Sequence, residues 1–493
     1  MTDATNDIQA SQGQLYPRRV YPMDGHDLSE EQIAVAFAMT SRRPEAFDEI
    51  AEKVSHEKAA DFHERWVLGY GHASVAEHAI VHIAVENVSR LACDTLEDNR
   101  LASYTEKSSR YQVMPEDYYH VPDELAQHPA LKKEYEAACQ TLFQSYFKLI
   151  EGCIEHLRKT TPRIASERDG AFNMRLRRVA TDHCRAVLPA ATLTNVGVTA
   201  NARTLEHAIA KLFSSGLAEE QDLGDAVREQ SRLITPTLIK YADKVDYLER
   251  ASGLQLDLAQ RFGFPSEEPS DSENSGTGAP EVRLVHWDRK GEEKIVSALL
   301  YRHSNLAYEQ VLERVKDLGS ESRQAIIDEC VAGIGPHDAP PREFEVVDYQ
   351  FEFMLDYGAY REFKRHRMMS YLPQPLTVAH GYRIPSLVSE AGLESEFGAA
   401  VSTAEAAYWK VREVSPLAVQ YLVTHAHNRR VVSKFNLREC YHLFKMRTSE
   451  EAHFSIREPM IEAMRLAVDV QPQFFRHLKL RNYPDWWPHP IEG

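Results

Sequence analysis

Residues 71–90 read GHASVAEHAIVHIAVENVSR, and the run HAIVHIAVENV within them alternates apolar and polar side chains. Such alternation is typical of a β-strand that buries only one of its faces. A basic, serine-rich segment, NRLASYTEKSSRY (99–111), comes after the run. We therefore predict that a half-buried strand leads towards a polar segment in this part of the chain.

A long amphipathic helix is predicted next, because apolar residues recur on one helical stripe. The stripe consists of Leu131, Tyr135, Ala138, Leu142, Tyr146, Leu149 and Leu157. After this helix come the segment LPAATLTNVGVT (188–199) and a second predicted helix that opens at Asn201.

The later part of the chain repeats this order of elements. Its segments are, in order, the alternating run VVDYQFEFMLDYG (346–358), the basic segment KRHRMMSYLPQ (364–374), a helix around 394–414, and HNRRVVSKF (427–435) before a helix that opens at Asn436. Arg100 lies 101 residues before Asn201, whereas Arg367 lies 69 residues before Asn436. We therefore predict a duplication with a large change in length, not a tight solenoid repeat.

One segment separates the two repeats. Residues 265–281, PSEEPSDSENSGTGAPE, are rich in Ser, Glu, Gly and Pro and contain no aliphatic side chain larger than Ala. Such a composition buries little surface and is typical of a flexible linker. We predict a first domain at 1–264, a linker at 265–281 and a second domain at 282–493, each domain within the usual size range.

The overall composition excludes several classes of protein. With 493 residues and a formal net charge of −17, the chain is unsuited to general nucleic-acid binding, although a few local arginines could still hold a small anion. The six cysteines are scattered, which argues against a disulfide framework or a zinc site. The polar start, MTDATNDIQASQGQ, does not resemble a signal peptide, and no apolar run has membrane-spanning length. We predict a cytoplasmic protein that contacts neither membrane nor nucleic acid.

Two clusters of polar residues are candidates for chemistry. Arg365, His366 and Arg367 are adjacent, and arginine presents a planar fork of donors that suits phosphate; a solvated basic turn is the alternative. The second cluster consists of Ser103, Glu106, Ser108 and Arg110, which could hold a phosphate and a ribose hydroxyl, or could simply cap a polar loop.

Two further arginines stand alone. Arg447 follows Asn436 by eleven residues in a largely apolar helix, and Arg185 precedes a Leu-Pro pair. Taken singly, each of these arginines is typical of a surface salt bridge.

Together these segments resemble the flavin-dependent thymidylate synthases. That family has a signature Arg-His-Arg-x-x-Ser-x-x-x-x-Ser-x-Arg, an earlier Gly-His-x-Ser-x-x-Glu-His segment, an Arg before a Leu-Pro pair, and an Asn-x-Arg helix with a further Arg eleven residues after the Asn. The first repeat matches this pattern with Gly71, His72, Ser74, Glu77, His78, Arg100, Ser103, Glu106, Ser108, Arg110 and Arg185. The second repeat matches it with Arg365, His366, Arg367, Ser370, Asn436, Arg438 and Arg447.

The departures from the signature are complementary. The first repeat has Asp98 and Asn99 in place of the first Arg and the His, and Leu212 in place of the helix Arg. The second repeat has Pro375 and Thr377 in place of the later Ser and Arg, Gln420 in place of the Leu-Pro Arg, and a degraded Gly-His segment. Because sites in this family lie between subunits, we infer that the two repeats pair and share one surviving composite site.

The resemblance implies an α+β fold of two tandem domains, each with a strand-rich core and long flanking helices. It also implies reductive methylation of dUMP to dTMP, with FAD as cofactor and with NADPH and methylenetetrahydrofolate as co-substrates. Arg447 would be catalytic, since a fixed cation at the uracil edge stabilises negative charge on the ring. The nucleotide would contact Glu106, Ser108, Arg110, Arg185 and Arg365. FAD would contact His72, Ser74, Arg365, His366, Arg367, Asn436, Arg438 and His442.

Two other functions remain open on the sequence alone. The chain could be a re-purposed or non-catalytic flavin and nucleotide-binding paralogue that acts on another pyrimidine nucleotide, or a structural duplication without flavin. Because family members are homotetramers, a tandem chain is expected to form a homodimer that imitates the tetramer.

Overall fold

A computed structural model describes residues 19, 21–23, 28–41, 43–69, 72–264 and 281–490. Residues 265–280 of the predicted linker lie outside this part, and the predicted domain boundaries stay a prediction. Glu281, the last residue of the predicted linker, already lies against the second sheet, because its carbonyl accepts a hydrogen bond of 2.9 Å from the amide of Met354.

The first domain is α+β. Its elements are α1 (Glu30–Thr40), α2 (Phe47–Ala51), α3 (His56–Phe62), η1 (His63–Gly69), η2 (Ala73–Glu77), β1 (Ile80–Ser89), α4 (Arg90–Glu97), β2 (Ala102–Glu106), η3 (Asp123–Leu125), α5 (Pro129–Thr160), α6 (Asp169–Cys184), η4 (Arg185–Val187), β3 (Leu193–Asn201), α7 (Ala202–Phe213), α8 (Ala218–Arg232) and α9 (Asp246–Arg261). The three strands form an antiparallel sheet in the order β1-β3-β2.

The second domain repeats this plan with additions. Its elements are β4 (Val282–Trp287), α10 (Gly291–Tyr301), α11 (Tyr308–Lys316), α12 (Ser320–Val331), η5 (Arg342–Val346), β5 (Asp348–Asp356), α13 (Tyr357–Phe363), β6 (Ser370–Pro373), α14 (Ser386–Glu390), α15 (Glu394–Arg412), η6 (Ala418–Leu422), β7 (Asn428–Asn436), α16 (Leu437–Arg447), α17 (Phe454–Val470) and η7 (Pro472–Phe475). The sheet order is β4-β5-β7-β6, so β5, β7 and β6 correspond to β1, β3 and β2.

The predicted strands and helices are confirmed, and equivalent helices begin in the same way. Asn201 and Asn436 end β3 and β7, and each side chain caps the helix that follows by accepting a hydrogen bond of 2.9 Å from the third backbone amide. Asparagine is among the best N-cap residues, because its oxygen satisfies a backbone donor that the helix leaves free. The caps therefore fix where α7 and α16 begin, and with them the direction of the candidate residues on α16.

The predicted change in length has a structural cause. Helix α5 has 32 residues, whereas its counterpart α15 has 19. The first domain also carries α6, a helix of 16 residues that has no counterpart between α15 and η6. Helices α10–α12 and η5 precede β5 as α1–α3 and η2 precede β1, whereas strand β4 has no counterpart in the first sheet.

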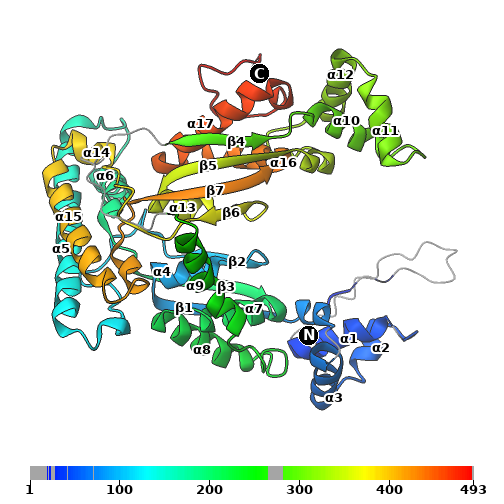
Figure 1. Ribbon diagram of the computed structural model, residues 1–493, viewed down its shortest axis with the longest axis horizontal. Coiled ribbons are helices and arrows are strands. Elements are labelled where there is room, and N and C mark those ends of the chain that lie inside the picture. The colour runs from blue at the N-terminus through cyan, green and yellow to red at the C-terminus, as the bar shows by residue number, and fades with distance from the viewer. Residues whose placement is uncertain are drawn as a thin grey trace.

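The two domains pack on each other within this chain (Figure 1). Helices α5 and α15 lie side by side, and the sheets lie one above the other with β2 and β6 at facing edges. Residues 186–191 and 421–426 exchange four backbone hydrogen bonds of 2.8–2.9 Å, and one core cluster draws buried residues from both domains. This pairing brings the ends of equivalent elements together at one interface.

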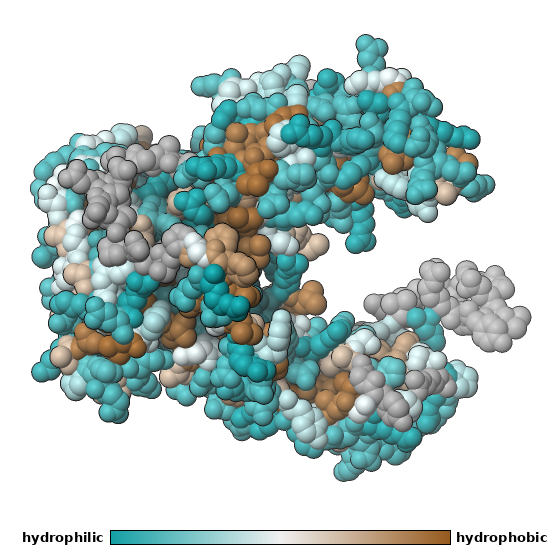
Figure 2. All heavy atoms as spheres, viewed as in Figure 1, coloured by the Kyte–Doolittle hydropathy of each residue, from teal (hydrophilic) through white to brown (hydrophobic). Residues whose placement is uncertain are grey.

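The surface is hollowed on one side. Figure 2 shows a notch between the lobe that carries α10–α12 and the lobe that carries α1–α3, with hydrophobic residues at its base. Within the described part of the chain, no helix combines the length and apolar character needed to span a membrane.

Candidate functional site

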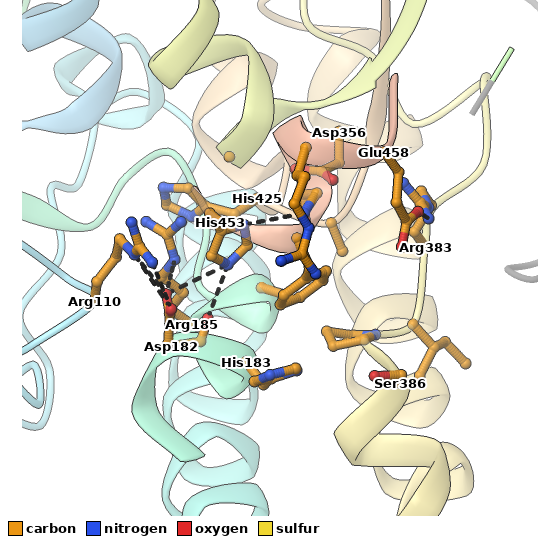
Figure 3. A pocket seen from close by; sticks show the side chains of 18 of the residues that line it. Arg110, Asp182, His183, Arg185, Asp356, Arg383, Ser386, His425, His453 and Glu458 are labelled. Atoms are coloured by element: carbon orange, nitrogen blue, oxygen red, sulfur yellow. Dashed lines mark hydrogen bonds and ion pairs between the residues drawn. The ribbon is translucent and has the colours of Figure 1, made fainter. Parts of the chain in front are cut away.

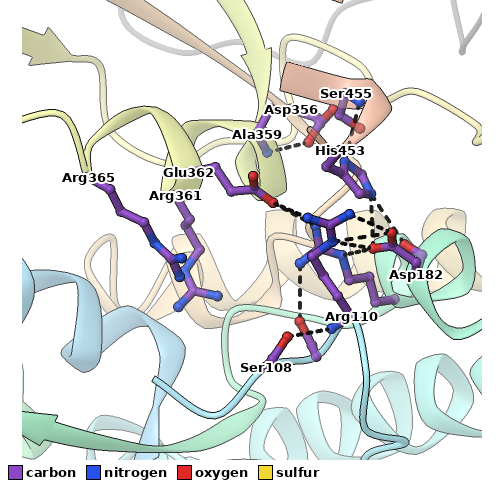
Figure 4. Close-up of polar contacts among 12 residues, drawn as sticks. Ser108, Arg110, Asp182, Asp356, Ala359, Arg361, Glu362, Arg365, His453 and Ser455 are labelled. Carbon is purple, nitrogen blue, oxygen red and sulfur yellow. Dashed lines mark hydrogen bonds and ion pairs between the residues drawn. The ribbon is translucent and has the colours of Figure 1, made fainter. Parts of the chain in front are cut away.

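Arginines from both domains converge on one carboxylate, that of Glu362 on α13. Arg185 of the first domain approaches it with Nη2 at 3.4 Å and Arg110 with Nη1 at 4.0 Å. Arg447 of the second domain donates from Nη1 at 3.3 Å, and from Nη2 at 3.2 Å to the Glu362 backbone carbonyl. Figure 4 shows Arg110, Glu362 and the neighbouring polar groups. Each guanidinium has five N–H donors and these contacts occupy only some of them, so donors remain for an anion.

Asp182 is the second carboxylate of the cluster. It accepts two parallel hydrogen bonds from Arg110, from Nε and Nη2 at 3.0 Å each, and lies 3.5 Å from Nε of Arg185. His453 contacts it from the second domain, with Nε2 at 3.3 Å from Oδ1. Burial lowers the pKa of His453 well below its usual value, and the nearby arginines lower it further, so this ring is neutral. Asp182 therefore holds Arg110 in place.

Arg447 is oriented by two groups. Its Nε donates to Nε2 of His366 at 2.9 Å, and its two terminal nitrogens face Glu362. Its side chain is 15% exposed and that of Arg185 is 9% exposed. Both arginines thus lie inside the domain interface, so the surface salt bridge that each suggests alone is wrong.

Glu106 is more enclosed than a freely accessible ligand group. Its Oε1 is 3.0 Å from Arg90, Oε2 accepts from Arg361, and Arg365 lies 3.8 Å away. Burial alone would raise the pKa of Glu106, but Arg361 and Arg90 outweigh burial and hold the pKa well below its usual value. Its role in substrate binding stays a prediction, because the structure places its carboxylate between arginines of the two domains.

The loop that follows α13 is exposed. The Arg365 side chain is 56% exposed, and Arg367 donates to the backbone carbonyls of Arg100 and Ala102 in the first domain. Three large apolar side chains on or beside this loop, Leu101, Met368 and Leu372, are 71%, 69% and 72% exposed. The loop therefore offers free cationic donors next to an apolar surface.

Other predicted residues lie further from the arginine cluster. Arg438 binds the Pro340 carbonyl at 2.9 Å and Glu345 at 3.2 Å, while His442 lies exposed beside His366. The hydroxyl of Ser108 accepts a hydrogen bond from the backbone amide of Arg110 in the turn after β2. His72 and Ser74 lie at η2, which packs against α1 and α7. Among described residues no hydrogen bond or ion pair joins His72 or Ser74 to the Arg365 loop, and their contact with FAD stays a prediction.

A cavity of about 710 Å³ adjoins the arginine cluster (Figure 3). Arg110, Asp182 and Arg185 line one side, and Asp356, His425 and His453 come from the second domain. His425 donates from Nδ1 to the Leu188 carbonyl at 2.7 Å, and its buried Nε2 has no hydrogen-bond partner among the residues that the structure describes. The cavity thus has cations on one wall and an unused acceptor on another.

Comparison with known proteins agrees with this duplicated arrangement. The sequence model of one family, thymidylate synthase complementing protein, matches residues 25–237 and again 283–473. The chain belongs to that family. The resemblance inferred from the motifs is therefore confirmed, and the double match is consistent with a tandem duplication.

Two relatives match nearly the whole of this chain. A UPF0159 protein of Chlamydia muridarum is 30% identical over 443 residues, which is 87% of this chain and 82% of the relative. A UPF0159 protein of Thermoplasma acidophilum is 27% identical over 494 residues, 91% and 95% of the two chains. These relatives share the tandem length.

Shorter relatives match less of the chain. A flavin-dependent thymidylate synthase of Sulfurisphaera tokodaii is 29% identical over 222 residues, 45% of this chain and 74% of that protein. Among solved structures, the UMP/dUMP methylase PolB of Streptomyces cacaoi covers 41% of this chain and 96% of its own at 13% identity. Its TM-score of 0.35 is too low to bear on fold or function.

The counterpart site of this family member is altered. Asp98, which stands where Arg365 stands in the second domain, accepts hydrogen bonds from Lys211 at 2.9 Å and from Tyr371 at 2.7 Å. The Gln420 side chain, equivalent to Arg185, accepts from the amide of Leu376. No arginine stands at these two positions or at the position of Leu212, so the counterpart lacks the cations gathered around Glu362.

Two residues of the cluster were missed by the motif reasoning, namely Asp182 and Glu362. Asp182 lies three residues before Arg185 at the end of α6, and residues at that spacing share a helix face, so this acid was an available signal. Glu362 accepts from Arg447, which lies 85 residues later in the sequence, so no local spacing indicated it.

Proposed function

We propose that this chain is a FAD-dependent thymidylate synthase that methylates dUMP to dTMP, with methylenetetrahydrofolate and NADPH as co-substrates. The observation that carries the proposal is the convergence of Arg110 and Arg185 from one domain and Arg447 from the other on Glu362. A site assembled in this way agrees with the complementary departures from the signature, since each domain supplies cations that the other lacks.

The charge of the cluster suits a nucleotide monophosphate. Arg110, Arg185 and Arg447 contribute three positive charges beside the two negative charges of Asp182 and Glu362, and Arg365 adds a fourth positive charge that also faces Glu106 at 3.8 Å. A site rich in arginine suits a phosphate monoester, which carries nearly two negative charges near neutral pH. Arg110 and Arg185 would bind the phosphate, and Arg447 would stabilise negative charge on the pyrimidine ring.

The residues near Arg365 fit a flavin. Leu101, Met368 and Leu372 present apolar surface next to the free donors of Arg365, and ligand sites typically combine apolar walls with a few polar groups. FAD, when bound, would supply the redox chemistry of the methylation. Arg365 and Arg367 would orient it, with Asn436, Arg438 and His442 as further predicted contacts.

The test is the visible absorbance of the purified protein supplied with FAD, before and after addition of dUMP, followed by detection of dTMP after addition of both co-substrates. A flavin band that shifts with dUMP, together with dTMP formation, supports the proposal. Absence of a flavin band after FAD is supplied would contradict it, and so would absence of dTMP from a protein that binds both ligands.

A second candidate is catalysis on another pyrimidine nucleotide. It is favoured by Glu362 and Asp182, because two carboxylates among the arginines can accept hydrogen bonds from donors that dUMP lacks, such as an amino group. The same absorbance titration with UMP and dCMP separates the candidates, since the true substrate gives the lowest dissociation constant. We further propose a homodimer, which sedimentation of the full chain would test.

A further inference from the structure

His366 and Glu439 form a buried pair behind Arg447. Glu439 lies on α16, and its Oε1 is 3.1 Å from Nδ1 of His366. Glu439 is only 7% exposed and His366 only 5%. On the other side of the ring, Nε2 of His366 is 2.9 Å from Nε of Arg447. The three side chains thus form one line that runs from a carboxylate through an imidazole to the candidate catalytic cation.

The donors and acceptors in this line fix the state of the ring. Arginine nitrogens can only donate, so Nε2 of His366 must carry the lone pair. The proton of the neutral ring then lies on Nδ1 and is donated to Glu439. Burial lowers the pKa of His366. The hydrogen bond that the ring donates to Glu439 raises this pKa and the charge of Arg447 lowers it, and the net effect is a lowered pKa, so the ring is neutral at neutral pH.

A metal site is the competing interpretation. His366, Glu439 and His442 place ligand atoms within 4.8 Å of one another, and two histidines with a carboxylate are a known metal-binding set. However, a metal on Nδ1 would leave a proton on Nε2 facing the donating Nε of Arg447. A metal on Nε2 would displace that hydrogen bond and would lie next to a fixed positive charge. Both arrangements conflict with the observed contacts.

We infer that Glu439 is a positioning residue, which holds His366 in the tautomer that accepts from Arg447 and so aims Arg447 into the composite site. This inference rests on the proposed function, which gives Arg447 its role in the site. The tautomer of His366 does not depend on any ligand.

The first measurement is the tautomer of His366 in the full chain, from nitrogen NMR of protein labelled in histidine, with the signal assigned by comparison with His366→Ala. Wild type is expected to show a proton on Nδ1. Glu439→Gln keeps an acceptor and should retain this tautomer, whereas Glu439→Ala should shift the population to Nε2. The control is Thr204→Ala, at the equivalent position of α7, which should leave the signal unchanged.

The second measurement is the affinity for dUMP, read from the flavin band. Loss of a hydrogen bond to a charged group predicts weakening by about 10- to 100-fold in Glu439→Ala and recovery to within about threefold in Glu439→Gln. The inference is overturned if Glu439→Ala keeps both the tautomer and the affinity, if both variants lose them equally, or if the purified wild type retains stoichiometric Zn²⁺ that His442→Ala loses. A wild type that shows the tautomer but does not bind dUMP would instead contradict the proposed function alone.

Discussion

Asp94 and Arg361 occupy equivalent positions in the two domains, and they form an ion pair with each other. Asp94 is the fifth residue after the cap Ser89, and Arg361 is the fifth after the cap Asp356. Nε of Arg361 lies 3.4 Å from Asp94, which also accepts from Lys364 at 3.2 Å. If the two domains were identical, like charges would meet at this point. The interface therefore favours pairing of the first domain with the second over pairing of either domain with a copy of itself.

Removing the charge of Asp94 should destabilise the protein strongly. In Asp94→Asn, Arg361 and Lys364 keep their charges in a buried interface and lose a carboxylate, which costs about 3–5 kcal/mol for a buried pair. The measurement is urea denaturation of the full chain. Glu155→Gln, which breaks an ion pair exposed at both ends, is the control and should leave the urea midpoint unchanged, because solvent screens such a pair. Equal effects in the two variants would contradict this account of the interface.

Neutralising Glu362 should strengthen anion binding. Glu362→Gln removes a negative charge near three arginines, and an attraction of a few kcal/mol at these distances predicts phosphate affinity higher by about 10-fold or more. Titration calorimetry with inorganic phosphate measures the change. Glu390→Gln, an exposed acid that lines the same cavity, should stay within about twofold of wild type because solvent screens its charge. Weaker phosphate binding in Glu362→Gln would show that the carboxylate acts mainly by orienting the arginines.

Replacing Arg185 by glutamine should weaken nucleotide binding at the composite site. Glutamine is the residue at the equivalent position of the second domain, Gln420. Loss of a charged donor in Arg185→Gln predicts nucleotide affinity lower by about 10- to 100-fold. The reciprocal change, Gln420→Arg, touches only the counterpart and should leave the affinity for dUMP unchanged. The flavin absorbance titration reads both variants, and an effect of Gln420→Arg as large as that of Arg185→Gln would rule out a single composite site.

Asp356 should make stability depend on pH. It caps α13 by accepting from the amide of Ala359 at 2.7 Å, and burial raises the pKa of its carboxyl. A raised pKa favours the protonated form in the folded state, so its contribution to stability is present below the ordinary aspartate pKa and is lost as pH rises through the raised value. Asp356→Asn keeps an equally good cap without the charge, so its advantage over wild type should grow with pH.

Urea midpoints of Asp356→Asn and wild type across pH 4–8 measure this difference. Asp169→Asn, an exposed residue in the first turn of α6, corrects for general effects of the substitution. An advantage of Asp356→Asn that is constant, or that shrinks as pH rises, would contradict the prediction.

The sequence predicted the individual strands and helices well, but it predicted poorly which side chains the packing of these elements brings into contact. The alternation of HAIVHIAVENV and the caps Asn201 and Asn436 are properties of neighbouring residues, so β1, α7 and α16 could be predicted from them. Strand β4 has no counterpart in the first sheet, so a comparison of the repeats could not indicate it.

The burial of Arg185 and Arg447 could not be predicted locally, because the carboxylate that they face belongs to a helix far away in the sequence. For the same reason the sequence could not indicate that Arg361 of the other domain donates to Glu106, whose role in substrate binding stays a prediction. The motifs identified the right arginines, but only the packing of the two domains gives their partners.

The backbone pairing of residues 186–191 with 421–426 also has a consequence for synthesis on the ribosome. Arg185 directly precedes residues 186–191, and the residues that pair with this segment are synthesised 230 or more residues later. Domains generally fold as they emerge, the N-terminal one first. The backbone groups of residues 186–191 therefore stay unpaired until η6 leaves the ribosome. The site acquires its geometry only in the last step of folding, when the two domains pack together.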